Sequence, residues 1–143
     1  MNVEIRRVGP GDEALFERIA PEVFDEAVTR ERLAAYLRAP GHHMLVALHA
    51  GEVVAQVAAV LHRHPDKIAE LYLDEVGVTP ALQRRGIAGR MVDMMLGIGR
   101  ELGCGEAWVG TEHDNVAARA LYRRREGEES TFVMFLYDLE DTP

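Results

Sequence analysis

Cysteine and long apolar runs are scarce in this chain of 143 residues. Its only cysteine, Cys104, excludes an internal disulfide and fits a reducing cytoplasm, where we expect the thiol to be a small buried hydrophobic group. No apolar run reaches the ~18 residues that a membrane-spanning helix needs, and the first residues lack the apolar core of a signal peptide. These absences predict a cytoplasmic protein with no membrane partner.

An excess of basic charge is also missing, because 16 Lys and Arg residues stand against 24 Asp and Glu residues, a formal net charge of −8. Nucleic-acid binding needs a basic face, so no nucleic-acid partner is expected. The acidity favours a cationic small molecule instead. Hydrophobic residues make up 48% of the chain and charged residues 28%, which is typical of a globular protein. The length fits one domain over residues 1–143.

The spacing of apolar residues predicts an α/β domain with a mixed central sheet. Strands are expected over residues 3–8, 44–48, 53–61, 68–78, 107–109 and 131–139, and a further short strand near residue 128 would make six to seven. About four helices are expected: a short one that ends at Pro21, and others over 29–39, 87–102 and 115–125. The Ala50-Gly51 pair predicts a hairpin between the second and third strands.

The segment from Gln83 to Gly89 joins the expected strand 68–78 to the expected helix 87–102. Such a junction leaves backbone N–H groups unpaired at the positive end of a helix dipole, which suits a phosphate. Gly86 and Gly89 would let the backbone approach an anion, and Arg84 and Arg85 can add charge-assisted hydrogen bonds. The spacing is neither the dinucleotide fingerprint nor a P-loop. An ordinary surface loop with solvated arginines is the alternative.

A second motif follows the expected strand 107–109 and reads Asn115-Val-Ala-Ala118-Arg-Ala-Leu121-Tyr122. The first motif, in the loop described above, reads Gln83-x-x-Gly86-x-Ala88. Together they resemble the cofactor motifs of the GNAT superfamily of N-acetyltransferases, and the resemblance covers nearly the whole chain. It implies the GNAT fold and acetyl-coenzyme A as cofactor. It also implies that Asn115 contacts the pantetheine arm and that the hydroxyl of Tyr122 approaches the thioester sulfur.

The implied cofactor-binding residues come from a strand edge, the loop and the second motif. They are Val76, Val78, Gln83, Arg84, Arg85, Gly86, Ile87, Ala88, Gly89, Asn115, Ala118 and Tyr122. The family usually has Leu and then Gly three and four residues after the tyrosine. This chain has Arg125 and Glu126 there, with Gly127 one place later. We therefore expect the end of this helix to slip by one residue.

Within the superfamily, the segments 23–26, 51–59, 70–78 and 83–88 are most similar to type I aminoglycoside 3-N-acetyltransferases. This resemblance implies acetylation of one amine of a polycationic aminosugar antibiotic, which confers resistance. A GNAT enzyme for another amine (a polyamine, a small metabolite or a protein N-terminus) is one alternative. A non-catalytic acyl-coenzyme A-binding module is another, but the presence of Glu75 and Tyr122 beside both motifs argues against it.

An amine must lose its proton before it attacks a thioester, and the departing thiolate needs a proton. Glu75, in the strand before the loop, is the preferred general base, and Asp74 is its competitor. Strand alternation places the two on opposite faces, so that only one can point into the cleft, unless a β-bulge reverses the assignment. The alternative to a catalytic role is that both carboxylates are simply solvated. Tyr122 is the expected general acid, with a packed helix aromatic as its alternative role.

Acidic residues are expected to line an anionic acceptor cleft, although fewer than half of them should contact substrate. The candidates are Asp25, Glu26, Asp74, Glu112, Asp114, Asp138, Glu140 and Asp141. His113 stands between two of these candidates in the sequence, so it is expected near the cleft, where it can orient substrate. His62 and His64 make a weak metal site because no carboxylate or cysteine partner accompanies them, so no metal is expected. The apolar segment 132–136 can serve as a homodimer face or as a buried last strand.

Overall fold

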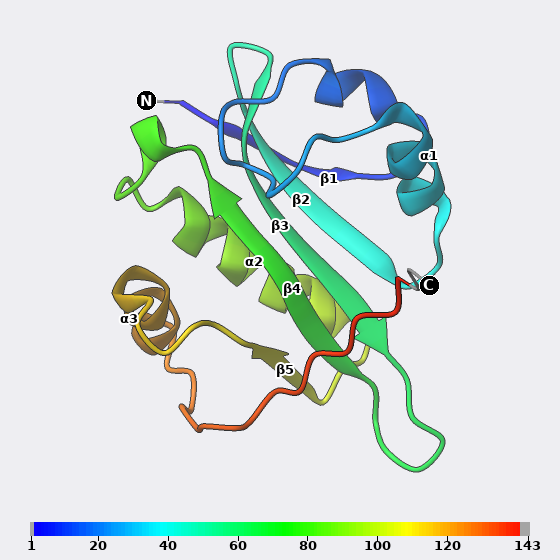
Figure 1. Cartoon of the computed structure of the whole chain (residues 1–143), viewed down its shortest axis with the longest axis vertical. Coiled ribbons are helices and arrows are strands. Elements are labelled where there is room, and N and C mark those ends of the chain that lie inside the picture. The colour runs from blue at the N-terminus through cyan, green and yellow to red at the C-terminus, as the bar shows by residue number, and fades with distance from the viewer. Residues whose placement is uncertain (1, 141–143) are drawn as a thin grey trace.

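Figure 1 shows the computed structural model of the chain, which describes residues 2–140. Its strands form one mixed sheet in the spatial order β1-β2-β3-β4-β5. Their bounds are Glu4–Val8 (β1), His42–His49 (β2), Glu52–His62 (β3), Glu70–Val78 (β4) and Glu106–Val109 (β5). The first four strands pair antiparallel, and β5 runs parallel to β4. The predicted mixed α/β sheet is confirmed, with five strands rather than six or seven among the described residues.

The hairpin between β2 and β3 follows from the Ala50-Gly51 pair. Both residues have a positive φ, 49° and 78°, which is the combination that a two-residue type I′ turn requires. Residues 44–48 and 53–59 are buried without interruption. Alternate side chains of a strand point to opposite faces, so both faces of this central pair must be covered. The predicted hairpin is confirmed.

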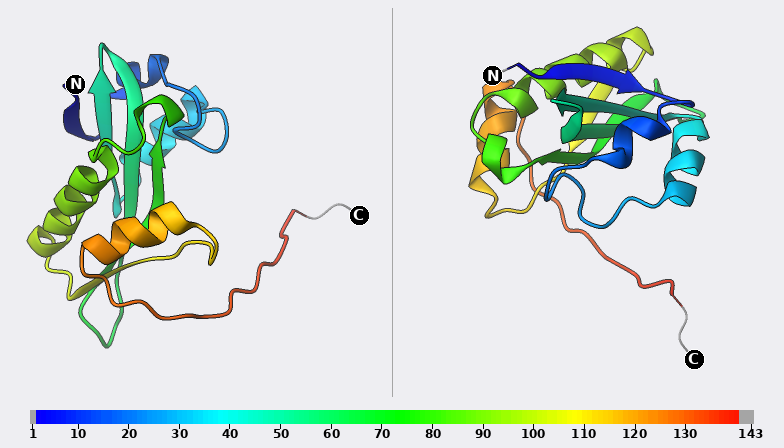
Figure 2. Two further views of the ribbon diagram at one scale, coloured as in Figure 1. Left: turned by 90° about the vertical axis from the view of Figure 1, so that its left-hand side faces the viewer. Right: turned by 90° about the horizontal axis from the view of Figure 1, so that it is seen from above.

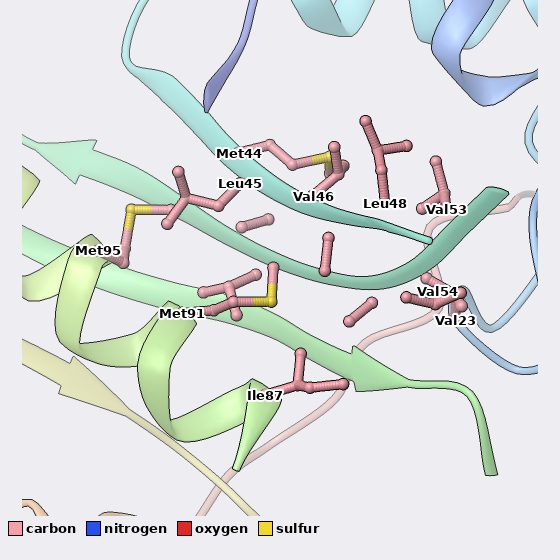
Figure 3. Close-up of a cluster of buried hydrophobic side chains, with 14 of the residues drawn as sticks. Val23, Met44, Leu45, Val46, Leu48, Val53, Val54, Ile87, Met91 and Met95 are labelled. Atoms are coloured by element: carbon pink, nitrogen blue, oxygen red, sulfur yellow. The ribbon is translucent and has the colours of Figure 1, made fainter. Parts of the chain in front are cut away.

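The helical elements are η1 (Glu13–Glu17, 3₁₀), α1 (Arg30–Arg38), η2 (Pro80–Leu82, 3₁₀), α2 (Ile87–Glu101) and α3 (Val116–Arg124). Helix α2 covers one face of the sheet, and its Ile87, Met91 and Met95 point into the buried cluster over the central strands (Figure 3). The helix lies close to the sheet because Gly99 has no side chain: a Cβ there would be 3.0 Å from the side chain of Leu71. The predicted amphipathic helix is confirmed.

The opposite face of the sheet carries η1 and α1 (Figure 2). Thr29 caps α1 as predicted, because its hydroxyl accepts a hydrogen bond from the backbone N–H of Arg32 at 3.2 Å. The expected first helix is only a 3₁₀ turn, since the chain soon turns to pair Ile19 with Val53 in a parallel bridge. Among the helices described, none is long and apolar enough to cross a membrane.

Strand β4 extends well beyond its pairing with β5. The register of the two strands runs only from Glu70 opposite Glu106 to Leu73 opposite Val109, whereas β4 continues to Val78. From residue 74 onward, the edge of β4 that faces away from β3 therefore has no neighbouring strand within residues 2–140. This end of β4 therefore offers free backbone groups along one edge.

Helix α3 begins as predicted at Asn115, whose Oδ1 accepts a hydrogen bond from the backbone N–H of Ala118 at 3.0 Å. The helix end does not slip by a residue, contrary to expectation. Glu126 adopts a left-handed conformation with a φ of 62°, and the N–H of Gly127 bonds back to the carbonyl of Tyr122 at 3.1 Å. This is the Schellman arrangement that usually places glycine at the left-handed position. Glu126 occupies that position here.

The expected final strand over residues 131–139 is wrong, as is the short strand near residue 128. From residue 127 to residue 140 the chain forms no helix or strand, and it leaves the sheet as an extended segment (Figure 2). Arg119 and Arg123 on α3 hold the carboxylate of Glu129 at 3.3 and 2.9 Å. These ion pairs hold the start of the segment on α3, and the large apolar side chains further along the segment are exposed.

Candidate active site

The loop between β4 and α2 presents backbone N–H groups at the start of α2. Gly86, the residue before the helix, has a φ of 79°, and no side chain caps the helix there. Arg84 is also left-handed, with a φ of 63°, and such turns of the backbone form anion-binding concavities. Arg84 and Arg85 are exposed. Gln83 holds the loop against the end of β4, because its Nε2 donates to the carbonyl of Val78 at 3.1 Å.

Gly89 has a close neighbour that the sequence did not predict. A Cβ on this residue would overlap the guanidinium group of Arg125, whose Nε donates to the Gly89 carbonyl at 3.1 Å. The same guanidinium forms an ion pair with Asp93 at 3.0 Å. The missing side chain of Gly89 therefore makes room for Arg125, and the arginine joins the end of α3 to the first turn of α2.

Tyr122 lies partly buried on α3 and packs against the hydrophobic core. Burial raises the pKa of its hydroxyl, so the group keeps its proton at neutral pH and can serve as a proton donor. Its two predicted roles, packed aromatic and general acid, are therefore compatible. Asn115 uses its side-chain oxygen to cap α3, which leaves its amide nitrogen for the predicted contact with pantetheine.

A β-bulge in β4 brings two carboxylates into one region. The register with β3 shifts between Leu73 and Glu75, which leaves Asp74 as the extra residue of the bulge. Alternation is broken at this point, which is the β-bulge alternative that the sequence left open. Burial raises the pKa of the Tyr36 hydroxyl on α1, and the negative charges of Asp74 and Glu75 raise it further.

Glu75 is better suited than Asp74 to act as a general base. Its side chain is partly buried, whereas Asp74 is exposed. Burial raises the pKa of Glu75, and the charges of Asp74 and Asp25 raise it further. Burial also raises the pKa of Asp74, but a backbone hydrogen bond and the nearby His42 act in the opposite direction. A carboxylate with a raised pKa is the stronger proton acceptor.

Two residues of this cluster were not anticipated from the sequence. The hydroxyl of Tyr36 is buried and has no hydrogen-bond partner within the part of the chain described, although it lies near two carboxylates. The ring of His42 meets the ring of Tyr36 edge-on, with centroids 5.2 Å apart. Tyr36 follows Leu33 at helical spacing, which indicates core packing, so the sequence conceals that its polar end reaches the carboxylates.

The segment between η1 and α1 lies over Gly77 of β4. A Cβ on Gly77 would overlap the carbonyl oxygen of Val23, and Nε2 of Gln56 donates to that oxygen at 3.3 Å. The same segment lines a cavity of about 410 Å³, with Asp25 and Glu26 in its wall. The close approach at Gly77 therefore places two of the predicted acceptor carboxylates over the strand that carries the candidate base Glu75.

The remaining acidic candidates are Glu112, Asp114, Asp138, Glu140 and Asp141, of which Asp141 lies outside the described residues. The first two are exposed in the loop before α3, and the next two lie on the segment that leaves the sheet. The structure does not gather these four around the candidate base Glu75. His113 is exposed, and its backbone carbonyl accepts a hydrogen bond from Arg119 at 2.7 Å.

Solved structures of other proteins share this fold. An aminoglycoside acetyltransferase from an uncultured soil metagenomic sample, in complex with sisomicin, has a TM-score of 0.80 at 20% identity, over 96% of this chain and 97% of that chain. AAC(6')-Iy in complex with a bisubstrate analogue has a TM-score of 0.77 at 18% identity, over 96% and 99%. A ribosomal-protein-alanine N-acetyltransferase from Brucella melitensis biovar Abortus 2308 has a TM-score of 0.70 at 18% identity, over 94% and 100%. At these identities the likeness shows the fold.

No curated protein sequence matches the chain at a significant level. The pattern of the acetyltransferase (GNAT) family, in contrast, matches residues 13–127. This span includes the loop before α2, the bulged carboxylates of β4 and the whole of α3. The match confirms the predicted GNAT fold and the predicted cofactor, acetyl-coenzyme A. The chain belongs to the acetyltransferase (GNAT) family.

Proposed function

We propose that this protein transfers the acetyl group of acetyl-coenzyme A to an amine of an aminoglycoside. The observation that carries the proposal is the carboxylate cluster of Asp25, Asp74 and Glu75, which lies where β4 separates from β5. Such a cluster attracts an acceptor with several ammonium groups and provides one carboxylate to take a proton. Two similar folds belong to aminoglycoside acetyltransferases, solved with sisomicin and with a bisubstrate analogue, and they support the same acceptor class.

The residues present fit acetyl-coenzyme A. The uncapped start of α2 at Gly86 and the side chains of Arg84 and Arg85 would hold the pyrophosphate through backbone N–H groups and guanidinium charge. The edge of β4 beyond Leu73 would hold the pantetheine arm in the manner of an added strand. Once bound, the cofactor supplies an acetyl carbonyl that is activated as a thioester.

Two side chains would move the protons. Glu75 would take a proton from the ammonium group of the acceptor and so free its nitrogen lone pair to accept the acetyl group. Tyr122 would give a proton to the sulfur that leaves. The raised pKa of Glu75 makes it a better base near neutral pH, and the raised pKa of Tyr122 keeps its hydroxyl protonated until the sulfur needs the proton.

Recognition of the acceptor would depend on attraction between carboxylates of the protein and ammonium groups of the acceptor. Asp25 and Glu26 line the cavity over β4 and would pair with ammonium groups that do not react. Partly exposed pairs are each worth only about 0–1 kcal/mol, so tight binding requires several together. This requirement favours a polycationic aminosugar over an amine with one charge. The sequence resemblance to 3-N-acetyltransferases further suggests that the 3-amine is the position acetylated.

The proposal is tested by measuring turnover of acetyl-coenzyme A with gentamicin-type aminoglycosides, spermidine and an alanine-initiated peptide, each over a range of salt concentrations. We expect the highest kcat/KM with the aminoglycosides and a KM for them that rises steeply with salt. Product analysis by NMR then shows which amine carries the acetyl group, and an acetyl group elsewhere would remove the 3-amine assignment alone.

Each rival function has its own outcome in this experiment. Equal turnover of spermidine or the peptide, without salt dependence, would overturn the aminoglycoside proposal and leave a GNAT enzyme of another acceptor class. Binding of acetyl-coenzyme A without turnover of any amine would identify a non-catalytic acyl-coenzyme A-binding module.

A further inference from the structure

The end of the β3–β4 hairpin that lies away from the loop before α2 holds a second cluster of polar side chains. His62 ends β3 and Glu70 begins β4, and the two are register partners across the strand pair. His64 follows in the connecting loop. We propose that these three side chains form a binding site for a divalent transition-metal ion, with Zn²⁺ as the representative ion.

The three side chains already converge. Nε2 of His64 lies 3.0 Å from Oε1 of Glu70, and Nδ1 of His62 lies 3.7 Å from the same oxygen. One ligand atom from each residue can be chosen so that all lie within 4.8 Å of one another. Ligands at the ~2.0–2.1 Å typical of zinc stand roughly 3.3 Å apart in a tetrahedron. Small side-chain rotations are therefore enough to enclose an ion.

The ligand types select the class of metal. Two imidazoles and one carboxylate are a common protein ligand set for zinc, with a fourth position left for water. Imidazole nitrogen disfavours Mg²⁺ and Ca²⁺, which prefer oxygen ligands. The side chain of His62 is 55% exposed while those of His64 and Glu70 are 17% and 26% exposed, so the open position would face solvent on the side of His62.

The sequence alone does not reveal this site, because its carboxylate, Glu70, comes close to the histidines only when β3 and β4 pair. The two histidines have no acidic ligand beside them along the chain apart from Asp66, which does not join the cluster. The antiparallel register brings Glu70 back opposite His62. Arg63 and Lys67 place two positive charges in the same loop against one negative charge, so metal binding would rest on coordination geometry rather than on a local negative field.

The site is separate from acetyl transfer. Glu70 and Glu75 are five positions apart on β4, which is roughly 17 Å along an extended strand. The bound ion would instead clip the last residue of β3 to the first residue of β4 and close the loop 63–69. Binding to the folded chain alone would raise its stability by mass action.

The test uses the full chain without a histidine tag, freed of metal by a chelator, and titrated with Zn²⁺ by calorimetry. We expect one ion per chain at micromolar concentration, and a higher melting temperature in the presence of zinc. Substituting Co²⁺ for Zn²⁺ should produce visible absorption bands of tetrahedral intensity. His64→Ala and Glu70→Gln should each weaken binding by more than tenfold. His49→Ala is the matched control, because His49 ends β2 and pairs with Glu52 at the other end of β3, and it should bind as the parent does.

A parent protein that shows neither zinc binding nor cobalt bands at millimolar ion would overturn the proposal and leave a hydrogen-bonded His–Glu pair. Equal affinity in the parent and His64→Ala would overturn it as well. If His64→Ala does not fold, His62→Ala decides the matter, because the exposed His62 side chain can be removed without disturbing the core. Its affinity should fall by the same factor, and an unchanged affinity would rule the site out.

Discussion

The guanidinium group of Arg125 occupies the space that a side chain on Gly89 would need. The arginine donates to the Gly89 carbonyl at 3.1 Å and pairs with Asp93 at 3.0 Å. It thereby joins the end of the helix that carries Tyr122 to the first turn of the helix that begins at the cofactor loop. Where the family usually has a leucine, this chain holds the same two helices together with a polar contact.

Gly89→Ala should displace the guanidinium of Arg125, the far end of a flexible side chain, and so break its hydrogen bond to the Gly89 carbonyl and its ion pair with Asp93. Such partly exposed pairs are worth about 0–1 kcal/mol, so the free energy of unfolding, measured in urea, should fall by up to about 1 kcal/mol. Adding Arg125→Leu to Gly89→Ala should recover part of the loss. Gly97→Ala is the matched control in the same helix, since nothing lies within 4 Å of its added Cβ. It should gain about 0.5–1 kcal/mol from helix propensity. Equal effects at the two glycines would contradict the close approach of Arg125.

Gly86→Asp should abolish binding of acetyl-coenzyme A while the protein stays folded. The new carboxylate would stand where the pyrophosphate needs N–H groups, and each charge-assisted hydrogen bond removed is worth about 1.5–3 kcal/mol. Gly103→Asp is the control, because Gly103 follows the other end of the same helix with a φ of 81° and an equally open Cβ position. Both variants carry the same backbone strain. Calorimetry that finds equal cofactor affinity in the two would remove the loop from the site.

The acid limb of the pH profile should report the carboxylate cluster. Glu75 must be deprotonated to act as a base, and its pKa is raised by burial, Asp74 and Asp25, so kcat/KM should begin to fall at a pH above the ordinary range of a glutamate. Asp25→Asn removes one neighbouring negative charge and should move this limb to lower pH. Glu17→Gln, an exposed change on η1, should leave the limb in place.

Linkage gives a second readout for the same group. A carboxyl whose pKa is raised by folding binds its proton more tightly in the folded state, so it lowers stability as the pH rises through its two pKa values. Glu75→Gln should therefore stabilise the protein at neutral pH and have little effect at acidic pH where the carboxyl is already protonated. A stability change of equal size at both pH values would show that Glu75 titrates normally.

Tyr122→Phe should lower kcat by a factor of about 10²–10⁴, the usual contribution of general acid catalysis, with little change in affinity for acetyl-coenzyme A. The ring would remain packed against the core, so the melting temperature should stay nearly constant. Tyr137→Phe, on the exposed C-terminal segment, should keep full turnover. Turnover of the parent level in Tyr122→Phe would leave Tyr122 with its packing role alone.

Local sequence signals predicted most of this fold. The Ala50-Gly51 turn, the Thr29 cap and the apolar spacing of α2 each act within a few residues, so they can be read without the rest of the chain. The final strand failed for the opposite reason. Residues 131–139 have strong β propensity, but a strand also needs a neighbouring strand to pair with, and the segment makes no such pairing within residues 2–140.

The candidate site shows the same division. The loop from Gln83 to Gly86 is contiguous, and its motif predicted an anion site directly. The carboxylate cluster depends on a bulge at Asp74 and on the approach of α1, which no spacing rule contains. Alternation alone therefore could not assign the faces of Asp74 and Glu75, and Tyr36 was hidden among the apolar positions of its helix.

Neither the outer edge of β5 nor the exposed segment from Phe132 to Leu139 pairs with a strand within residues 2–140. Each could pair with the other. Seven large apolar side chains of this segment are 68% to 89% exposed, and no described residue pairs with that edge. Two copies can complete both pairs reciprocally. We therefore expect the sedimentation coefficient to rise with concentration, and a chain that ends at Ser130 to lose this dependence. The segment from Phe132 to Leu139 would then determine the oligomeric state, separately from the residues proposed for acetyl transfer.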